Sequence, residues 1–73
     1  MSYLKEFRLA VYTMLGGLDM AEEFFRLHPC YFPAMRAVAQ YHRRKGGSAE
    51  KGARIWFQQV IRPQLKEDRE VAV

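Results

Sequence analysis

The chain has 73 residues, of which 49% are hydrophobic and 14% aromatic, and a net charge of +4; this composition fits one folded domain and excludes a disordered chain. No apolar run approaches the ~18 residues that a membrane span needs, so we expect none. The first residues lack the apolar stretch of a signal peptide, and Cys30 is the single cysteine, which leaves no disulfide framework. We therefore expect a protein of the reducing cytoplasm.

A first helix is predicted from Tyr3 to about Leu15. Ser2 can cap its start, and Gly16-Gly17 can adopt the left-handed backbone that ends a helix. Its apolar residues follow the spacing of one helix face, and they are Leu4, Phe7, Val11, Met14, Leu15 and Leu18.

A second, short helix is predicted to end near Leu27. Asp19 and Glu22 have the spacing of a capping box at its start. Pro29 disfavours helix at His28 and so ends the segment. The apolar face expected for this helix carries Met20, Phe24 and Leu27.

A third helix is predicted from Pro33, which suits a first helical position, to about Lys45. Gly46-Gly47 ends this helix. The side expected to face the core carries Met35, Val38, Ala39 and His42.

Ser48 can cap a fourth helix, whose apolar positions are Ala53, Trp56, Phe57, Val60 and Ile61. Pro63 removes a helical hydrogen bond, so we expect either a kink or a short extension through Leu65, followed by a frayed tail over residues 66–73. The chain is thus predicted to be a single all-α domain, residues 1–73. We expect a compact bundle of about four short helices, with the last two arranged as a helix-turn-helix.

Positive charge is concentrated in the middle of the chain. Residues 36–62 hold seven basic residues and one acidic residue, whereas each flanking segment has a net charge of −1. A helix dipole alone favours cations at a C-terminus by ~0.3–1 kcal/mol, and the same cations can grip phosphates or acidic side chains. The residues predicted to bind a partner are Arg36, Arg43, Arg44, Lys45, Lys51 and Arg54.

The sequence carries no pattern typical of an enzyme. His28 and Cys30 lie on a proline-bounded turn with no Asp or Asn nearby to orient the imidazole, so we interpret them as a turn histidine and a small buried thiol. With His42 they offer too few paired ligands for a zinc site. Gly46-Gly47-Ser48 lacks the preceding strand of a phosphate-binding loop. We expect no catalytic residue, metal, cofactor or small-molecule substrate.

The segment Arg54-Ile55-Trp56-Phe57-Gln58 is similar to the Trp-Phe-Gln centre of a homeodomain recognition helix. However, Gln59 stands where that family has its adenine-reading asparagine, and Pro63 would disturb the helix soon afterwards. We therefore interpret Trp56 and Phe57 as core residues.

Two functions of different classes are consistent with these features. The first is a regulator that binds a protein, with Tyr3, Tyr31 and Phe32 as candidate aromatic anchors. The second is a small DNA-binding protein that uses the basic middle and reads DNA with its fourth helix. Glu50 near the start of that helix would repel phosphate.

The length, the helical plan and the basic middle of the whole chain resemble those of small lytic-phage transcription regulators that bind the host's RNA polymerase. The resemblance assigns no role to any single residue. It implies a regulator that binds a subunit of bacterial RNA polymerase, in the host cytoplasm if a phage encodes it. Such regulators inhibit initiation by displacing the sigma factor, and they can also cause antitermination.

Overall fold

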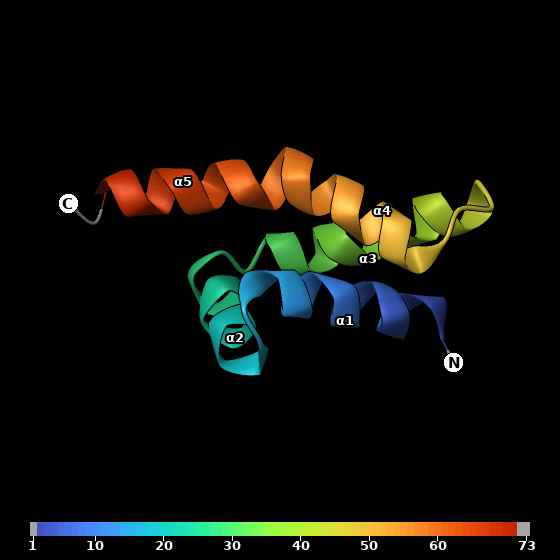
Figure 1. Cartoon of the computed structure of the whole chain (residues 1–73), viewed down its shortest axis with the longest axis horizontal. Helices are drawn as coiled ribbons and strands as arrows, with labels where there is room; N and C mark the ends of the chain where they lie inside the picture. Colours follow the sequence, from blue (N-terminus) through green and yellow to red (C-terminus); the bar gives the residue numbers. More distant parts are fainter. Residues whose placement is uncertain (1, 72–73) are drawn as a thin grey trace.

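The computed structural model describes residues 2–71, which are predominantly helical and include no strand. Three helices lie side by side, and a fourth crosses one end of them (Figure 1). Residues 49–71 form one continuous helical rod that extends beyond the other helices. The molecule therefore measures 41 × 21 × 18 Å. The elements are α1 (Tyr3–Leu15), α2 (Leu18–Leu27), α3 (Tyr31–Arg44), α4 (Ala49–Trp56), the π-helical segment η1 (Phe57–Ile61) and α5 (Arg62–Val71).

Helix α1 has the predicted bounds, and Gly16 ends it as expected. Gly16 has a φ of 113°, a left-handed conformation that side chains disfavour, and its N–H donates back to the carbonyl of Thr13. Ser2 occupies the N-cap position, but its side chain makes no capping hydrogen bond. Phe7, Val11 and Leu15 form the buried stripe of this helix.

The capping box predicted for α2 is wrong. Only two glycines separate α1 from α2, so α2 begins at Leu18 and Asp19 lies inside its first turn, where it makes no capping bond. The predicted face is also partly wrong, because Met20 and Leu27 are 57% and 55% exposed. The buried face is instead Ala21, Phe24 and Phe25. The rings of Phe24 and Phe25 pack on aromatic side chains from α1 and α3, which fixes this orientation.

Helix α3 begins two residues before Pro33, at Tyr31. Pro33 still lies in the first turn, where a missing N–H costs no helical hydrogen bond. The predicted side of α3 is confirmed: Met35 and Ala39 are buried, and Val38 and His42 are half-buried.

Helix α4 begins as predicted, because the side chain of Ser48 accepts a hydrogen bond from the N–H of Lys51 at 3.1 Å. Trp56 is 5% exposed, which confirms that it is a core residue, and Phe57 is half-buried. Gly52 is buried against α3, where a Cβ atom would lie 2.8 Å from Cγ of His42. Helices α3 and α4 can therefore approach this closely only with glycine at that position.

The rod does not end at Pro63. It passes through a π-helical turn, in which the N–H of Arg62 donates to the carbonyl of Phe57, and continues as α5. A proline ring normally clashes with the carbonyl four residues earlier, and the wider π turn relieves that clash. Residues 66–71, where the sequence suggests a frayed tail, are helical; residues 72–73 lie outside the described residues.

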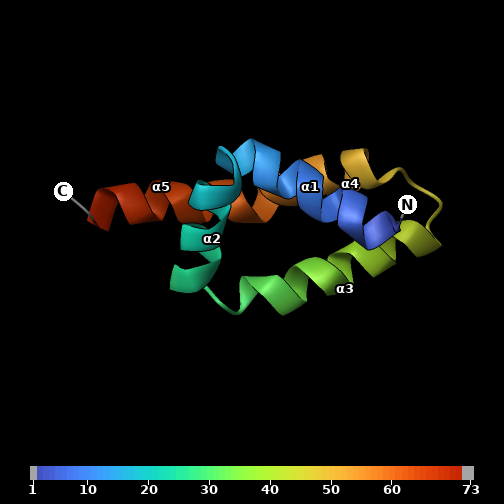
Figure 2. The same ribbon diagram turned by 90° about the horizontal axis from the view of Figure 1, so that it is seen from below.

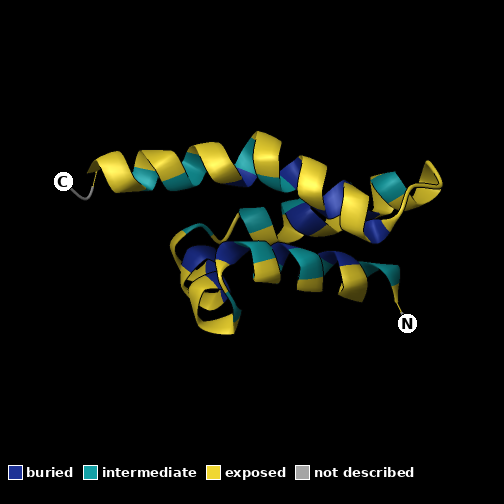
Figure 3. Cartoon of the chain, viewed as in Figure 1, coloured by how far each residue is buried: buried dark blue, intermediate teal, exposed yellow. Residues whose placement is uncertain are grey.

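The core lies between α1, α2, α3 and the first part of the rod, which is α4 and η1. Helix α5, the last part of the rod, contributes no buried residue (Figure 3). The largest fully buried side chains of the core are Phe7, Met35, Ile61 and Val11. The remaining buried residues of this core are Leu15, Ala21, Phe24, Phe25, Ala39, Ala49, Ala53 and Trp56.

Candidate functional site

Four of the six predicted partner-binding residues gather around the turn between α3 and α4, at the end of the molecule opposite the tip of α5 (Figure 1). We call them the basic end: Arg43 and Arg44 in the last turn of α3, Lys45 directly after it, and Lys51 in the first turn of α4. All four side chains are exposed. Within residues 2–71, none of them forms an ion pair with a carboxylate.

An exposed aromatic ring lies beside the basic end. Tyr41 is 51% exposed, and the Nζ atom of Lys45 is 5.5 Å from the centre of its ring. A cation over an aromatic face gains ~0.5–1 kcal/mol at an exposed site. The pair gives this end an apolar contact surface next to its charges.

The turn that carries the basic end is fixed to the core from two sides. The hydroxyl of Tyr3 donates to the carbonyl of Gly47 at 2.8 Å, which ties the start of α1 to the turn. The imidazole of His42 stacks on Phe7, with 6.3 Å between the ring centres, and packs against Gly52. Tyr3 thus has a structural role in addition to the anchor role proposed from sequence.

The other two predicted residues lie apart from the basic end. Arg36 is seven residues before Arg43 on α3, which corresponds to about 10.5 Å along the helix axis. It lines a hollow between α1 and α3 together with Arg8. Arg54 is engaged within its own helix, because its guanidinium is 3.4 Å from the Glu50 carboxylate.

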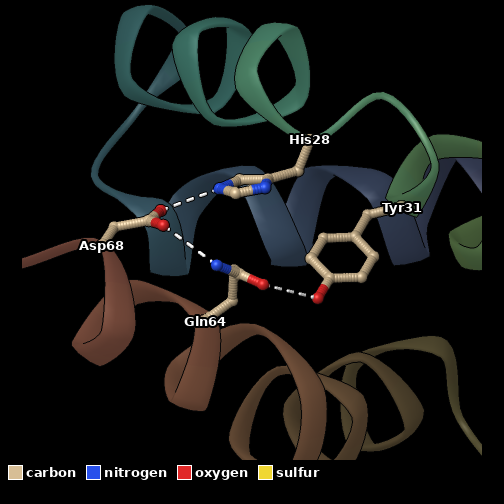
Figure 4. A network of polar contacts seen from close by, with 4 residues as sticks. All are labelled: His28, Tyr31, Gln64 and Asp68. Atoms are coloured by element: carbon tan, nitrogen blue, oxygen red, sulfur yellow. Dashed lines mark hydrogen bonds and ion pairs between the residues drawn. The ribbon is translucent and has the colours of Figure 1, made fainter. Parts of the chain in front are cut away.

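A polar network, which the sequence did not predict, joins α5 to the connector between α2 and α3 (Figure 4). The Asp68 carboxylate lies 2.8 Å from Nε2 of His28 and accepts a hydrogen bond from the Gln64 amide at 2.9 Å. The hydroxyl of Tyr31 donates to the side-chain oxygen Oε1 of Gln64 at 2.9 Å. The side chains of His28 and Asp68 are 22% and 34% exposed, so water reaches the network.

This network holds the pKa of Asp68 below its ordinary value, chiefly through the hydrogen bond with His28 and then through the one from Gln64. The expectation that no Asp stands near His28 is wrong. His28 and Asp68 are 40 positions apart, so the sequence does not indicate that they meet. Gln64 and Asp68 have the four-residue spacing of neighbours on a helix, which is the one contact of the network that the sequence could indicate. Cys30 is exposed on the adjacent turn, so the expectation of a buried thiol is also wrong.

An open groove of about 680 Å³ runs between α1 and the start of α4. Its floor is apolar, from Leu9, Ala10, Met14 and Ala49, and its rim carries Glu6, Glu50 and Arg54. The groove therefore has both signs of charge, whereas the four residues of the basic end beside it are all cations.

No protein-family model, curated protein or solved structure matches this chain. Over the described residues, no helix combines the length and the apolar character needed to cross a bilayer.

Proposed function

We propose that this protein is a non-enzymatic regulator that binds a subunit of bacterial RNA polymerase in the cytoplasm and alters transcription. In this proposal it inhibits initiation by displacing the sigma factor, and it also acts in antitermination. The observation that carries the binding proposal is the basic end, where four exposed cations gather at the α3–α4 turn and one of them, Lys45, lies over the exposed ring of Tyr41. The choice of polymerase rests on the resemblance of the whole chain to small lytic-phage regulators.

The basic end has the physical properties of a protein-binding surface. Its cations make no ion pair within residues 2–71, so an acidic partner breaks no carboxylate pair there. Like charges gathered on one surface also steer an acidic partner toward it and raise the association rate. Arginine and tyrosine are enriched among the residues that dominate binding energy. The bond from Tyr3 and the packing of His42 hold the turn in place, which lowers the entropy lost on binding.

The identity of the partner is tested by capture from a bacterial lysate with the tagged protein. We expect RNA polymerase subunits to be recovered. Recovery of nucleoid proteins or free DNA without polymerase would contradict the proposal.

A helix-turn-helix that binds duplex DNA is the second candidate. It is favoured by the start of α4, where Ser48 caps the helix directly after the turn and Lys51 and Arg54 follow. Glu50 opposes this function, because its carboxylate lies at the entry of the helix and occupies Arg54. A gel shift with random duplex DNA separates the two candidates. Strong binding at low salt that collapses at high salt would favour DNA binding.

A further inference from the structure

The hollow between α1 and α3 is lined by two arginines and by apolar side chains, whereas the other two grooves also contain glutamates. Leu4 and Arg8 come from α1, and Phe32, Met35 and Arg36 come from α3; together they enclose about 110 Å³. Met35 is fully buried and forms an apolar floor. Two guanidinium groups from different helices thus border one small hollow, and no carboxylate lines it.

Neither arginine of this hollow is neutralised. Arg8 and Arg36 form no ion pair within residues 2–71. Two like charges that share a hollow repel each other, and an anion placed between them removes that repulsion. A phosphate can accept charge-assisted hydrogen bonds from both guanidinium groups, often two from each.

The third component is an exposed aromatic ring. Phe32 is 36% exposed, and its ring packs edge-on against Phe25, with 5.4 Å between the ring centres. Phe25 in turn contacts Tyr12 at 5.8 Å. The ring of Phe32 is therefore supported from behind while part of its surface faces solvent, as in a platform on which a base stacks.

These residues continue into a longer strip along α3. Phe32, Arg36 and Arg43 are separated by four and seven residues, so they project from the same side of the helix over about 16 Å. Beyond Phe32 the surface is no longer purely basic, because the next hollow is bordered by Glu22, Glu23 and Arg26, and the Arg26 guanidinium lies 3.9 Å from the Glu23 carboxylate. Helix α3 runs beside α1 (Figure 2), so the strip follows α3 from Phe32 toward the basic end.

We propose that this strip, made of Phe32, Arg8, Arg36 and Arg43, binds single-stranded nucleic acid. Arg8 and Arg36 hold one phosphate between them, Arg43 contacts another, and a base stacks on Phe32. A single strand is favoured over a duplex because an exposed ring needs an unstacked base, and the bases of a duplex stack on one another. This binding activity goes beyond the proposed polymerase contact and does not depend on it.

The test is fluorescence anisotropy of the full-length protein with a short labelled oligonucleotide of mixed sequence. The oligonucleotide is supplied as RNA, as DNA and as a duplex, at several salt concentrations. We expect saturable binding of both single strands that weakens as salt rises, with weaker binding of the duplex. No saturable binding of either strand at low salt, or binding of the duplex at least as tight, would overturn the proposal.

Variants separate this strip from general charge attraction. Arg8→Gln with Arg36→Gln removes the two side chains that hold one phosphate, so the slope of log affinity against log salt should fall by about 0.7. The matched control, Arg44→Gln with Lys66→Gln, removes the same charge elsewhere and should change the slope less. Equal losses in both double variants would show non-specific attraction and reject the strip.

The role of Phe32 is tested with a conservative pair. Phe32→Leu keeps an apolar side chain but loses the ring, and we expect it to weaken binding by about fivefold or more without changing the salt slope. Phe32→Tyr keeps the ring and should bind as the natural chain does. Circular dichroism confirms folding of each variant. If Phe32→Leu binds normally and polyglutamate competes as well as the oligonucleotide, the strip is an acidic-protein site and the proposal is wrong.

Discussion

The imidazole of His42 packs directly on Gly52, where α3 and α4 touch. A Cβ atom at position 52 would lie 2.8 Å from Cγ of His42 and 3.0 Å from its Cβ and Cδ2. The ring cannot retreat freely, because it also stacks on Phe7. Glycine in a helix normally costs ~1 kcal/mol relative to alanine, so here close packing outweighs helix propensity.

We predict that Gly52→Ala lowers the free energy of unfolding by about 1–2 kcal/mol, since overpacking costs ~1–3 kcal/mol and the gain in propensity offsets part of it. Urea denaturation measures the change. In a His42→Gly background neither the ring nor the Cβ atom of residue 42 obstructs position 52, so the same substitution should be neutral or stabilising. An equal loss in both backgrounds would show that the contact with His42 is not the cause.

Asp68 gives a prediction for the pH dependence of stability. Its pKa is lower in the folded protein than the ordinary carboxyl value of 3.8, through its hydrogen bonds with His28 and Gln64. A lowered pKa adds stability above the ordinary value, and this contribution is lost as pH falls through the folded pKa. The stability difference between the natural chain and Asp68→Asn should therefore shrink as the pH falls below about 4. Chemical denaturation at a series of acidic pH values measures it. A difference that grows on acidification would contradict this account.

Helix α5 is held mainly by polar contacts. It contributes no buried residue, and Leu65 is its half-buried apolar contact with the core. The network of Tyr31, Gln64, Asp68 and His28 joins it to the α2–α3 connector. Since water reaches these groups, we expect α5 to open locally at a lower free energy than α1 or α4 does.

We predict that Tyr31→Phe speeds amide hydrogen exchange in α5. The substitution removes the hydroxyl that donates to Gln64 while leaving the ring free to stack on Phe24. One hydrogen bond contributes ~0.5–1.5 kcal/mol, so exchange should rise by up to about tenfold. Tyr12→Phe is the matched control, because it removes a tyrosine hydroxyl from outside the network and should leave exchange in α5 unchanged. Equal exchange in α5 for both variants would mean that the network does not hold the helix.

The helices themselves were largely predictable, because their start and stop signals are local. Gly16 ends α1 and Ser48 caps α4 by contacts within a few residues. The capping box at Asp19 failed because two glycines left α2 no room for a longer connection. The helix continues through Pro63 because of a π turn, in which Ile61 is buried in the core. A rule based on neighbouring residues alone does not predict such a turn.

The candidate site was predictable only in part. Consecutive cations on one helix stay together in any fold, so Arg43, Arg44 and Lys45 form a group as expected. The positions of Arg36 beside Arg8 and of Asp68 beside His28 depend on how distant helices pack. No spacing in the sequence carries that information.

Charge divides the molecule into regions. The turn between α3 and α4 is basic, the α1–α4 groove has both signs, and the hollow beyond Phe32 is bordered by Glu22, Glu23 and Arg26. Such a division orients an approaching charged partner as well as attracting it. The basic end is the part of this surface that the proposed polymerase contact requires.

The most direct test of that contact is the affinity of purified RNA polymerase for two charge-reversed variants, with circular dichroism as the check on helicity. Arg43→Glu with Arg44→Glu reverses two charges in the basic end. Lys66→Glu with Arg69→Glu reverses two charges on α5, so both variants have the same net charge. We predict that the first variant weakens binding by about tenfold or more with unchanged helicity, whereas the second binds nearly as the natural chain does. Unchanged affinity of the first variant, or equal losses in both, would contradict a polymerase contact at the basic end.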